Sequence, residues 1–235
     1  MSMKTKFILI VLLISAECAG KSNDGTLSPG NLRCEYLINP SGIDITNPCL
    51  SWNSASEKRN QKQTAYRILV SSSLRKLNSD KGDLWDSEKV DSGESIHVMY
   101  KGKPLHSEDE CFWKVKVWNG EGKESAWSEP AKWSMGLLDE AGWEGYWIGL
   151  DSLVGNDKQF GLSARYLRKE FAAAKKVKRA TAYLCGLGLF ELYVNGNKIG
   201  DQVLAPALSE YPKTLYYMTF DVTKEMNKGQ NAVGV

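Results

Sequence analysis

Short runs of alternating hydrophobic and polar residues recur along this chain, and their period of two predicts β-strands. The clearest run places Trp113, Val115 and Val117 on one face and lysines on the other. Successive side chains of a strand point to opposite sides, so we expect the first face to lie in a core. An Asn-Gly pair, Asn195-Gly196, follows another alternating run and supplies the positive φ angles of a tight turn. This combination predicts a β-hairpin.

Seven strand-like runs, separated by residues typical of turns, occupy the first part of the chain. A series of short strands at this spacing predicts a β-sandwich, with Trp52 as its central core residue. The predicted strands are 32–37, 49–52, 64–72, 84–89, 97–100, 111–118 and 131–135.

A second group of runs follows a short connector, 138–142. Trp143, Tyr146 and Trp147 open this group, and we expect them to begin a second core. The last run, 232–235, starts a strand at the end of the sequence. Because an unpaired apolar strand edge promotes aggregation, we expect the sequence to be part of a longer polypeptide. The remaining strand-like runs are 164–171, 179–196 and 215–223.

Composition adds few functional constraints. A chain of 235 residues with 42% hydrophobic content is long enough for two domains. Its 30 basic and 28 acidic residues leave a net charge of +2, which is too balanced to indicate a nucleic-acid or membrane-surface partner. The densest basic run, 175–179, is interpreted as a solvated strand or loop edge.

The first twenty residues predict an export signal. Lys4 and Lys6 precede an apolar run, 7–14, that is too short to span a bilayer. We interpret 1–20 as a cleaved signal peptide, which places the protein in the periplasm or outside the cell. Lipid attachment at Cys18 is the alternative, less favoured because Glu17 precedes the cysteine. Residues 21–31 are polar and rich in Gly, Ser and Asn, so we expect a flexible linker there.

Export would expose four cysteines to oxidising conditions, in which three pairings are open. Strand-like apolar surroundings favour free core thiols for at least two of them, Cys111 and Cys185. The sequence has no Cys-x-x-Cys, and its two histidines have no ligand spacing, so no metal site is predicted. The four cysteines are Cys34, Cys49, Cys111 and Cys185.

No catalytic residue is predicted. The sequence lacks a Gly-x-Ser-x-Gly motif, and its histidines offer little material for a triad. The acidic cluster 108–110 precedes a strand and is interpreted as a solvated loop. Glycoside cleavage needs two carboxylates at a defined separation, and no such pair is recognisable from the sequence.

Several motifs nevertheless resemble one family of enzymes. The words "LYVNG", "IGD", "LAP", "EY" and "YYMTFDVT" follow one another between 192 and 223. In this order they resemble the amino-terminal β-sandwich of bacterial α-L-rhamnosidases of glycoside hydrolase family 78. Three motifs earlier in the chain resemble a fibronectin type III domain: "AYRILVSS", "LWDSEKVDS" and "CFWKVKVWNGEGKESAWSE".

The resemblance implies an all-β protein in two parts: a fibronectin type III-like sandwich at 32–138 and an incomplete jelly-roll-like sandwich at 143–235. It also implies that these domains brace a downstream helical barrel that carries the catalytic carboxylates. The whole enzyme would hydrolyse terminal α-L-rhamnose of glycosides or polysaccharides. The implied partners are a rhamnose-containing glycan and the catalytic domain of the same polypeptide. The alternatives are a free-standing carbohydrate-binding module and an adhesin-like scaffold.

Some family members bind rhamnose on a sandwich of this kind with the help of calcium, so calcium is the one ion that the resemblance implies. Aromatic and carboxylate or amide groups would form such a site. Related sequences have Trp where Leu208 stands, which weakens sugar stacking here. The predicted carbohydrate-binding residues are Asn195, Asp201, Glu210 and Tyr211.

Overall fold

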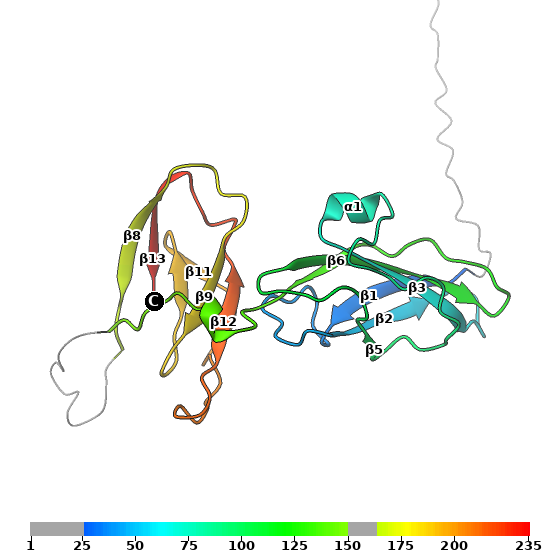
Figure 1. Cartoon of the computed structure of the whole chain (residues 1–235), viewed down its shortest axis with the longest axis horizontal. Helices are drawn as coiled ribbons and strands as arrows, with labels where there is room; N and C mark the ends of the chain where they lie inside the picture. Colours follow the sequence, from blue (N-terminus) through cyan, green and yellow to red (C-terminus); the bar gives the residue numbers. More distant parts are fainter. Residues whose placement is uncertain (1–25, 150–163) are drawn as a thin grey trace, which may run out of the picture.

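The computed structural model describes residues 26–149 and 164–235, which form two β-domains side by side (Figure 1). The predicted signal peptide, 1–20, lies outside the described residues. The strands are almost all antiparallel neighbours, as expected for an all-β chain. No helix among the described residues has the length and hydrophobicity needed to cross a membrane.

The first domain is an immunoglobulin-like sandwich of two sheets. One sheet has the order β1-β2-β5 and the other the order β4-β3-β6-β7. The central pair of the larger sheet, β3 and β6, is antiparallel and aligns Ile68 with Val115. The strands are β1 (Ser28–Cys34), β2 (Cys49–Ala55), β3 (Gln63–Ser71), β4 (Trp85–Asp86), β5 (Val98–Met99), β6 (Glu110–Asn119) and β7 (Ala131–Ser134).

The core of this domain follows the predicted alternation. Trp113, Val115 and Val117 of β6 are fully buried between the sheets. Trp52 is buried as predicted, and its ring meets that of Tyr66 edge to face with 5.2 Å between centroids. The period-two pattern therefore identifies the inward face of both central strands.

The domain begins earlier than the sequence indicates. Strand β1 starts at Ser28, and Leu27 and Pro29 are already buried. The predicted linker, 21–31, is therefore wrong over its last residues, which pair with Ala55, Ser54 and Asn53 of β2. A Pro-Gly pair reads as a loop in sequence, but this end of β1 lies on a sheet edge, where proline is tolerated.

The second domain packs a four-stranded sheet, β11-β10-β13-β8, against a two-stranded sheet, β12-β9. Its small core contains Leu192, Val194, Phe220 and Val222. The strands are β8 (Arg168–Ala173), β9 (Thr181–Cys185), β10 (Leu192–Val194), β11 (Asn197–Ile199), β12 (Tyr217–Asp221) and β13 (Gly229–Gly234).

The predicted hairpin is confirmed. Strands β10 and β11 pair from Leu192–Ile199 to Val194–Asn197, with Asn195 and Gly196 as the two turn residues. Their φ values of +51° and +85° are those that the turn requires.

Two expectations about this domain are wrong. Strand β13 is not an unpaired edge, because it lies between β10 and β8 and bonds to both. Trp143, Tyr146 and Trp147 do not begin a core: they are 38%, 93% and 62% exposed and follow the short 3-10 helix Glu140–Gly142. Aromatic content alone indicated burial, but this segment forms no strand that could place its side chains between sheets.

Candidate functional site at the junction between the domains

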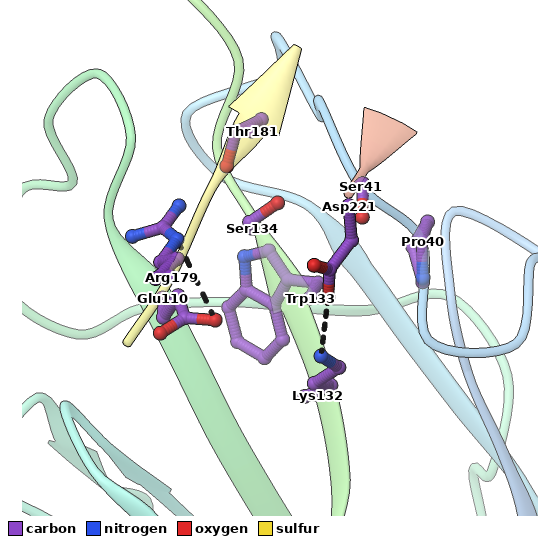
Figure 2. Close-up of a pocket in the computed structure, with 9 residues that line it drawn as sticks. All are labelled: Pro40, Ser41, Glu110, Lys132, Trp133, Ser134, Arg179, Thr181 and Asp221. Carbon is purple, nitrogen blue, oxygen red and sulfur yellow. Dashed lines mark ion pairs between the residues drawn. The ribbon is translucent and has the colours of Figure 1, made fainter. Parts of the chain in front are cut away.

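The two domains meet where the ends of β6 and β7 approach the ends of β9 and β12 (Figure 2). Glu110, Lys132 and Trp133 come from the first domain, and Arg179 and Asp221 come from the second. Strand alternation fixes these directions: Trp133 points into the first core, whereas Lys132 points out of it toward the neighbouring domain.

Tyr217 ties the start of β12 to the connector of the first domain. Its hydroxyl oxygen accepts a hydrogen bond of 2.9 Å from the Leu137 backbone N–H. Its ring lies 5.9 Å from that of Trp143 and 6.1 Å from that of Tyr183, measured between centroids. Leu137 and Trp143, which flank the connector 138–142, therefore both contact Tyr217 of the second domain, one through a hydrogen bond and the other through ring packing.

Two glycines allow the close approach. A Cβ atom at Gly136 would collide with the Tyr217 hydroxyl, and one at Gly42 would collide with the Thr219 side chain. Gly42 also has a φ of +78°, which side chains other than glycine rarely adopt. The backbone of the first domain is thus in direct contact with side chains of the second.

Two ion pairs cross the junction. Lys132 Nζ lies 3.6 Å from Asp221 Oδ2, and Arg179 Nε lies 3.8 Å from Glu110 Oε1. Arg179 Nη1 also donates to the Glu108 carbonyl oxygen at 3.0 Å. Figure 2 shows the two pairs on either side of the Trp133 indole.

The charge on Asp221 is stabilised by its neighbours. Burial alone would raise the pKa of this carboxyl, but hydrogen bonds from Thr223 and the ammonium of Lys132 outweigh burial and hold the pKa below its ordinary value. Asp221 is therefore ionised at neutral pH and cannot serve as a proton donor there.

The cavity at the junction is too small for a sugar. It encloses about 10 Å³, which is room for a single water molecule, whereas ligand sites enclose several hundred Å³. Within the described residues, the buried Trp133 Nε1 beside this cavity donates no hydrogen bond. The junction is thus a packed contact between domains, and the Trp133 N–H beside it has no partner among the described residues.

Metal ligands and reactive thiols are two further candidates for chemistry among the described residues. No group of three or more His, Cys, Asp or Glu side chains gathers among them to hold a metal ion. Cys34, Cys49, Cys111 and Cys185 are free. Burial raises the pKa of Cys34, and it raises that of Cys111 to about 12, so these two thiols stay protonated and inert.

The acidic cluster 108–110 is structural. Glu110 is the first residue of β6 and pairs with Arg179, and Asp109 accepts a hydrogen bond of 2.8 Å from the His106 backbone N–H. The expectation of a purely solvated cluster is wrong at these two positions, because the second domain and the preceding turn supply partners that the local sequence does not reveal.

The four predicted carbohydrate-binding residues lie in two places. Asn195 sits in the β10–β11 turn, and its amide makes three hydrogen bonds: Nδ2 donates to Glu225 O and Asn231 Oδ1, and Oδ1 accepts from Ala232 N. The other three lie on the segment between β11 and β12, exposed, with Glu210 paired to Lys213 at 2.9 Å.

Arg179 is the junction residue that sequence reasoning missed. It ends the basic run 175–179, whose lysines are exposed as expected. Its partners lie about seventy positions earlier in the sequence, so no local pattern reveals them. The sequence does not indicate the role of Gly136 and Gly42 either, because that role depends on a contact with the other domain.

Two family models match the chain. The model described as "Rha78A-like, N-terminal immunoglobulin domain" matches residues 29–139. The model described as "Alpha-L-rhamnosidase N-terminal domain" matches residues 175–235. These matches coincide with the first sandwich and with most of the second.

Two proteins with similar sequences are α-L-rhamnosidases. An α-L-rhamnosidase of Formosa agariphila is 42% identical over 98% of this chain and 26% of its own length, and one of Alteromonas sp. is 33% identical over 97% of this chain and 25% of its own length. The chain thus spans about a quarter of the length of these two relatives.

Solved structures of α-L-rhamnosidases also resemble this chain. The α-L-rhamnosidase from Dictyoglumus thermophilum superposes with a TM-score of 0.78 and 40% identity over 88% of this chain and 24% of that one. The enzyme from Aspergillus terreus superposes with a TM-score of 0.70 and 26% identity over 89% of this chain and 23% of that one. By sequence and by fold, this chain belongs to the amino-terminal, two-sandwich region of the α-L-rhamnosidase family.

Proposed function

We propose that this chain is the non-catalytic amino-terminal part of an exported α-L-rhamnosidase, in which the two sandwiches brace the catalytic unit. The observation that carries the proposal is the extent of the match: 98% of this chain aligns with only 26% of the Formosa agariphila relative. Most of such an enzyme lies outside the matched region. A free-standing binding module or adhesin is not favoured, because the similar proteins are α-L-rhamnosidases.

The junction supports the bracing role. Its ion pairs, the Tyr217 hydrogen bond and the two tight glycine contacts join the domains over several independent points. An extended two-domain unit held in this way can position a further domain. The substrate proposed for the complete enzyme is a glycan with terminal α-L-rhamnose.

The test is hydrolysis of p-nitrophenyl α-L-rhamnopyranoside. The 235-residue chain alone should release no nitrophenol above a protein-free control. A fusion in which this chain replaces the matched region of the Formosa agariphila relative should hydrolyse the substrate. Turnover by the chain alone would refute the division of labour, and an inactive but folded fusion would refute the supporting role.

Direct sugar binding at Asn195, Asp201, Glu210 and Tyr211 stays a prediction. Calorimetric titration of the chain with L-rhamnose, with and without calcium, tests it. Heat release that disappears in Tyr211→Ala but persists in Tyr146→Ala, an exposed tyrosine outside the predicted site, would support binding there. Absence of heat in both conditions would exclude it.

A further inference from the structure

One end of the second domain carries a dense cluster of exposed apolar side chains. Between β11 and β12, Val203, Leu204 and Leu208 are 76%, 80% and 84% exposed. The loop between β9 and β10 adds Leu187 and Leu189. We call these five residues the loop surface. Single exposed apolar residues are normal, but a cluster of them marks an interaction site.

The two loops form one connected surface. The Phe190 backbone N–H donates to the Ala205 carbonyl oxygen at 2.9 Å, which joins the β9–β10 loop to the segment between β11 and β12. Figure 1 shows the latter segment, in orange, projecting from one end of the domain.

Packing and hydrogen bonds hold the segments that carry the loop surface in place. Pro206 is buried, and the Phe190 ring packs edge to face on Phe220 of the core at 6.5 Å between centroids. Further along, the backbone N–H groups of Lys213 and Thr214 both donate to the Glu210 carbonyl oxygen, at 2.8 and 2.9 Å. These anchors hold the segment while its leucine and valine side chains point outward.

The chemistry of the loop surface fits a protein better than a sugar. Sugars stack on aromatic rings and bond to polar groups, whereas leucine and valine offer neither. Asp201, Glu210 and Lys213 lie on the same segment and are exposed. Exposed apolar residues together with charged ones on one segment are typical of a protein–protein interface.

We propose that the loop surface docks onto the part of the polypeptide that follows the matched region in α-L-rhamnosidases. The inference rests on the proposed function and names the surface through which the brace acts. Its support from the comparisons is length: about three quarters of the Formosa agariphila relative lies outside the region that this chain matches.

Limited trypsin digestion measures whether the segment that carries the loop surface is accessible. Lys213 lies on the segment, and its side chain is 72% exposed. Cleavage after Lys213, followed by mass spectrometry, should be about tenfold slower in the fusion with the Formosa agariphila remainder than in this chain alone, because docking lowers the population of the cleavable state. Cleavage after Arg59, in an exposed loop of the first domain, should proceed equally in both.

A double variant tests the side chains. Leu204→Asp with Leu208→Asp should restore rapid cleavage after Lys213 in the fusion. Leu74→Asp, an exposed leucine of the first domain, should not. Circular dichroism and an unchanged rate at Arg59 show that the variants are folded.

Three results would overturn the proposal. Equal cleavage after Lys213 in fusion and chain would show that the remainder does not cover the surface. A dimer of the chain in sedimentation, dissociated by the double variant, would make a second copy the occupant. Protection of Lys213 by L-rhamnose alone would make it a sugar site. Hydrolysis by the fusion is read separately, so an active fusion with unprotected Lys213 refutes docking and leaves the proposed function standing.

Discussion

Two buried tryptophans of the first domain differ in the state of the indole N–H. Trp52 Nε1 donates to Gln63 Oε1 at 2.9 Å, and Gln63 in turn donates to the Glu94 carbonyl oxygen at 2.7 Å. Trp133 Nε1 donates no hydrogen bond within the described part of the chain. Both side chains are 1% exposed, so they form a matched pair.

We expect Trp52→Phe to destabilise the domain more than Trp133→Phe. Both variants lose similar buried volume, but only the first also loses a hydrogen bond and leaves Gln63 with one partner fewer. The difference in the free energy of unfolding should be about 1 kcal/mol, measured by urea titration. Equal losses would show that the Trp133 N–H is as well satisfied as that of Trp52.

A side-chain ion pair predicts how stability depends on pH. Arg67 of β3 binds Asp86 of β4 at two points, Nε to Oδ1 at 2.9 Å and Nη2 to Oδ2 at 2.6 Å. The Arg67 guanidinium holds the pKa of the Asp86 carboxyl below its ordinary value. The stabilisation is therefore complete above the ordinary carboxyl pKa and is lost as the pH falls through the lowered pKa of the folded state.

Asp86→Asn should make the free energy of unfolding less sensitive to pH. At pH 6 the variant should be less stable than the parent by about 1 kcal/mol at most, because both partners are partly exposed and solvent screens them. The gap should shrink as the pH falls below 4. Asp91→Asn, at a carboxylate that is 88% exposed, should follow the parent at every pH. A gap that widens in acid would contradict this reading of the ion pair.

At the scale of elements, the β10–β11 turn is fastened to β13 by one side chain. Asn195 combines a φ of +51° with three hydrogen bonds of 2.7–2.9 Å, to Glu225, Asn231 and Ala232. Asn231 is itself buried and holds the preceding turn through Asn227. The hairpin and the central strand are thus linked by an amide pair.

Asn195→Ala should lower the free energy of unfolding by about 2–3 kcal/mol. The substitution removes these hydrogen bonds and leaves their buried partner groups unpaired, and it places an alanine at a positive φ, which is strained. Asn197→Ala, an exposed position of β11, is the matched control and should change it by less than about 0.5 kcal/mol. Thermal unfolding monitored by circular dichroism measures both. Equal effects would mean that the amide network carries no stability.

The strands were predictable where one face is buried and the other is solvated, because hydrophobic and polar residues then alternate along the sequence. Strand β6 over most of its length and the β10–β11 hairpin are of this kind, whereas in β3 Leu69 and Ser71 of the outer face are buried as well. The helix α1 (Leu74–Asn78) was not predicted, since five residues are too few to show a helical period. Lys114 also departs from the pattern: it is buried on the outer face, where it contacts Asp80 and lies over the Trp127 ring.

The junction lay beyond sequence reasoning for a different reason. Each of its ion pairs and hydrogen bonds joins residues 69 or more positions apart, and each residue has an ordinary local role in a strand, turn or basic run. Only the folded arrangement brings Arg179 to Glu110 and Tyr217 to Leu137. The loop surface was not predicted either: Asp201, Glu210 and Tyr211 were predicted on the same segment, but as carbohydrate-binding residues, and only the fold shows that the adjacent leucines are exposed.

At the scale of the whole molecule, Gly136 and Tyr217 determine how closely the domains approach. Gly136→Ala should destabilise the chain by about 1–3 kcal/mol, because the new methyl group meets the Tyr217 hydroxyl. Tyr217→Phe should cost about 1 kcal/mol through loss of the hydrogen bond to Leu137. The double variant should cost less than the sum, because removing the hydroxyl makes room for the methyl group.

Scanning calorimetry measures these effects and also shows whether the domains unfold together. If the junction couples them, the parent chain unfolds in one transition, and Gly136→Ala separates the unfolding of the second domain, whose core is smaller, from that of the first. Gly120→Ala, where a Cβ meets open space, should leave both the transition and its midpoint unchanged. Strictly additive losses in the double variant would mean that the two side chains do not meet, and the brace would then depend on the contacts of Arg179, Lys132 and Gly42.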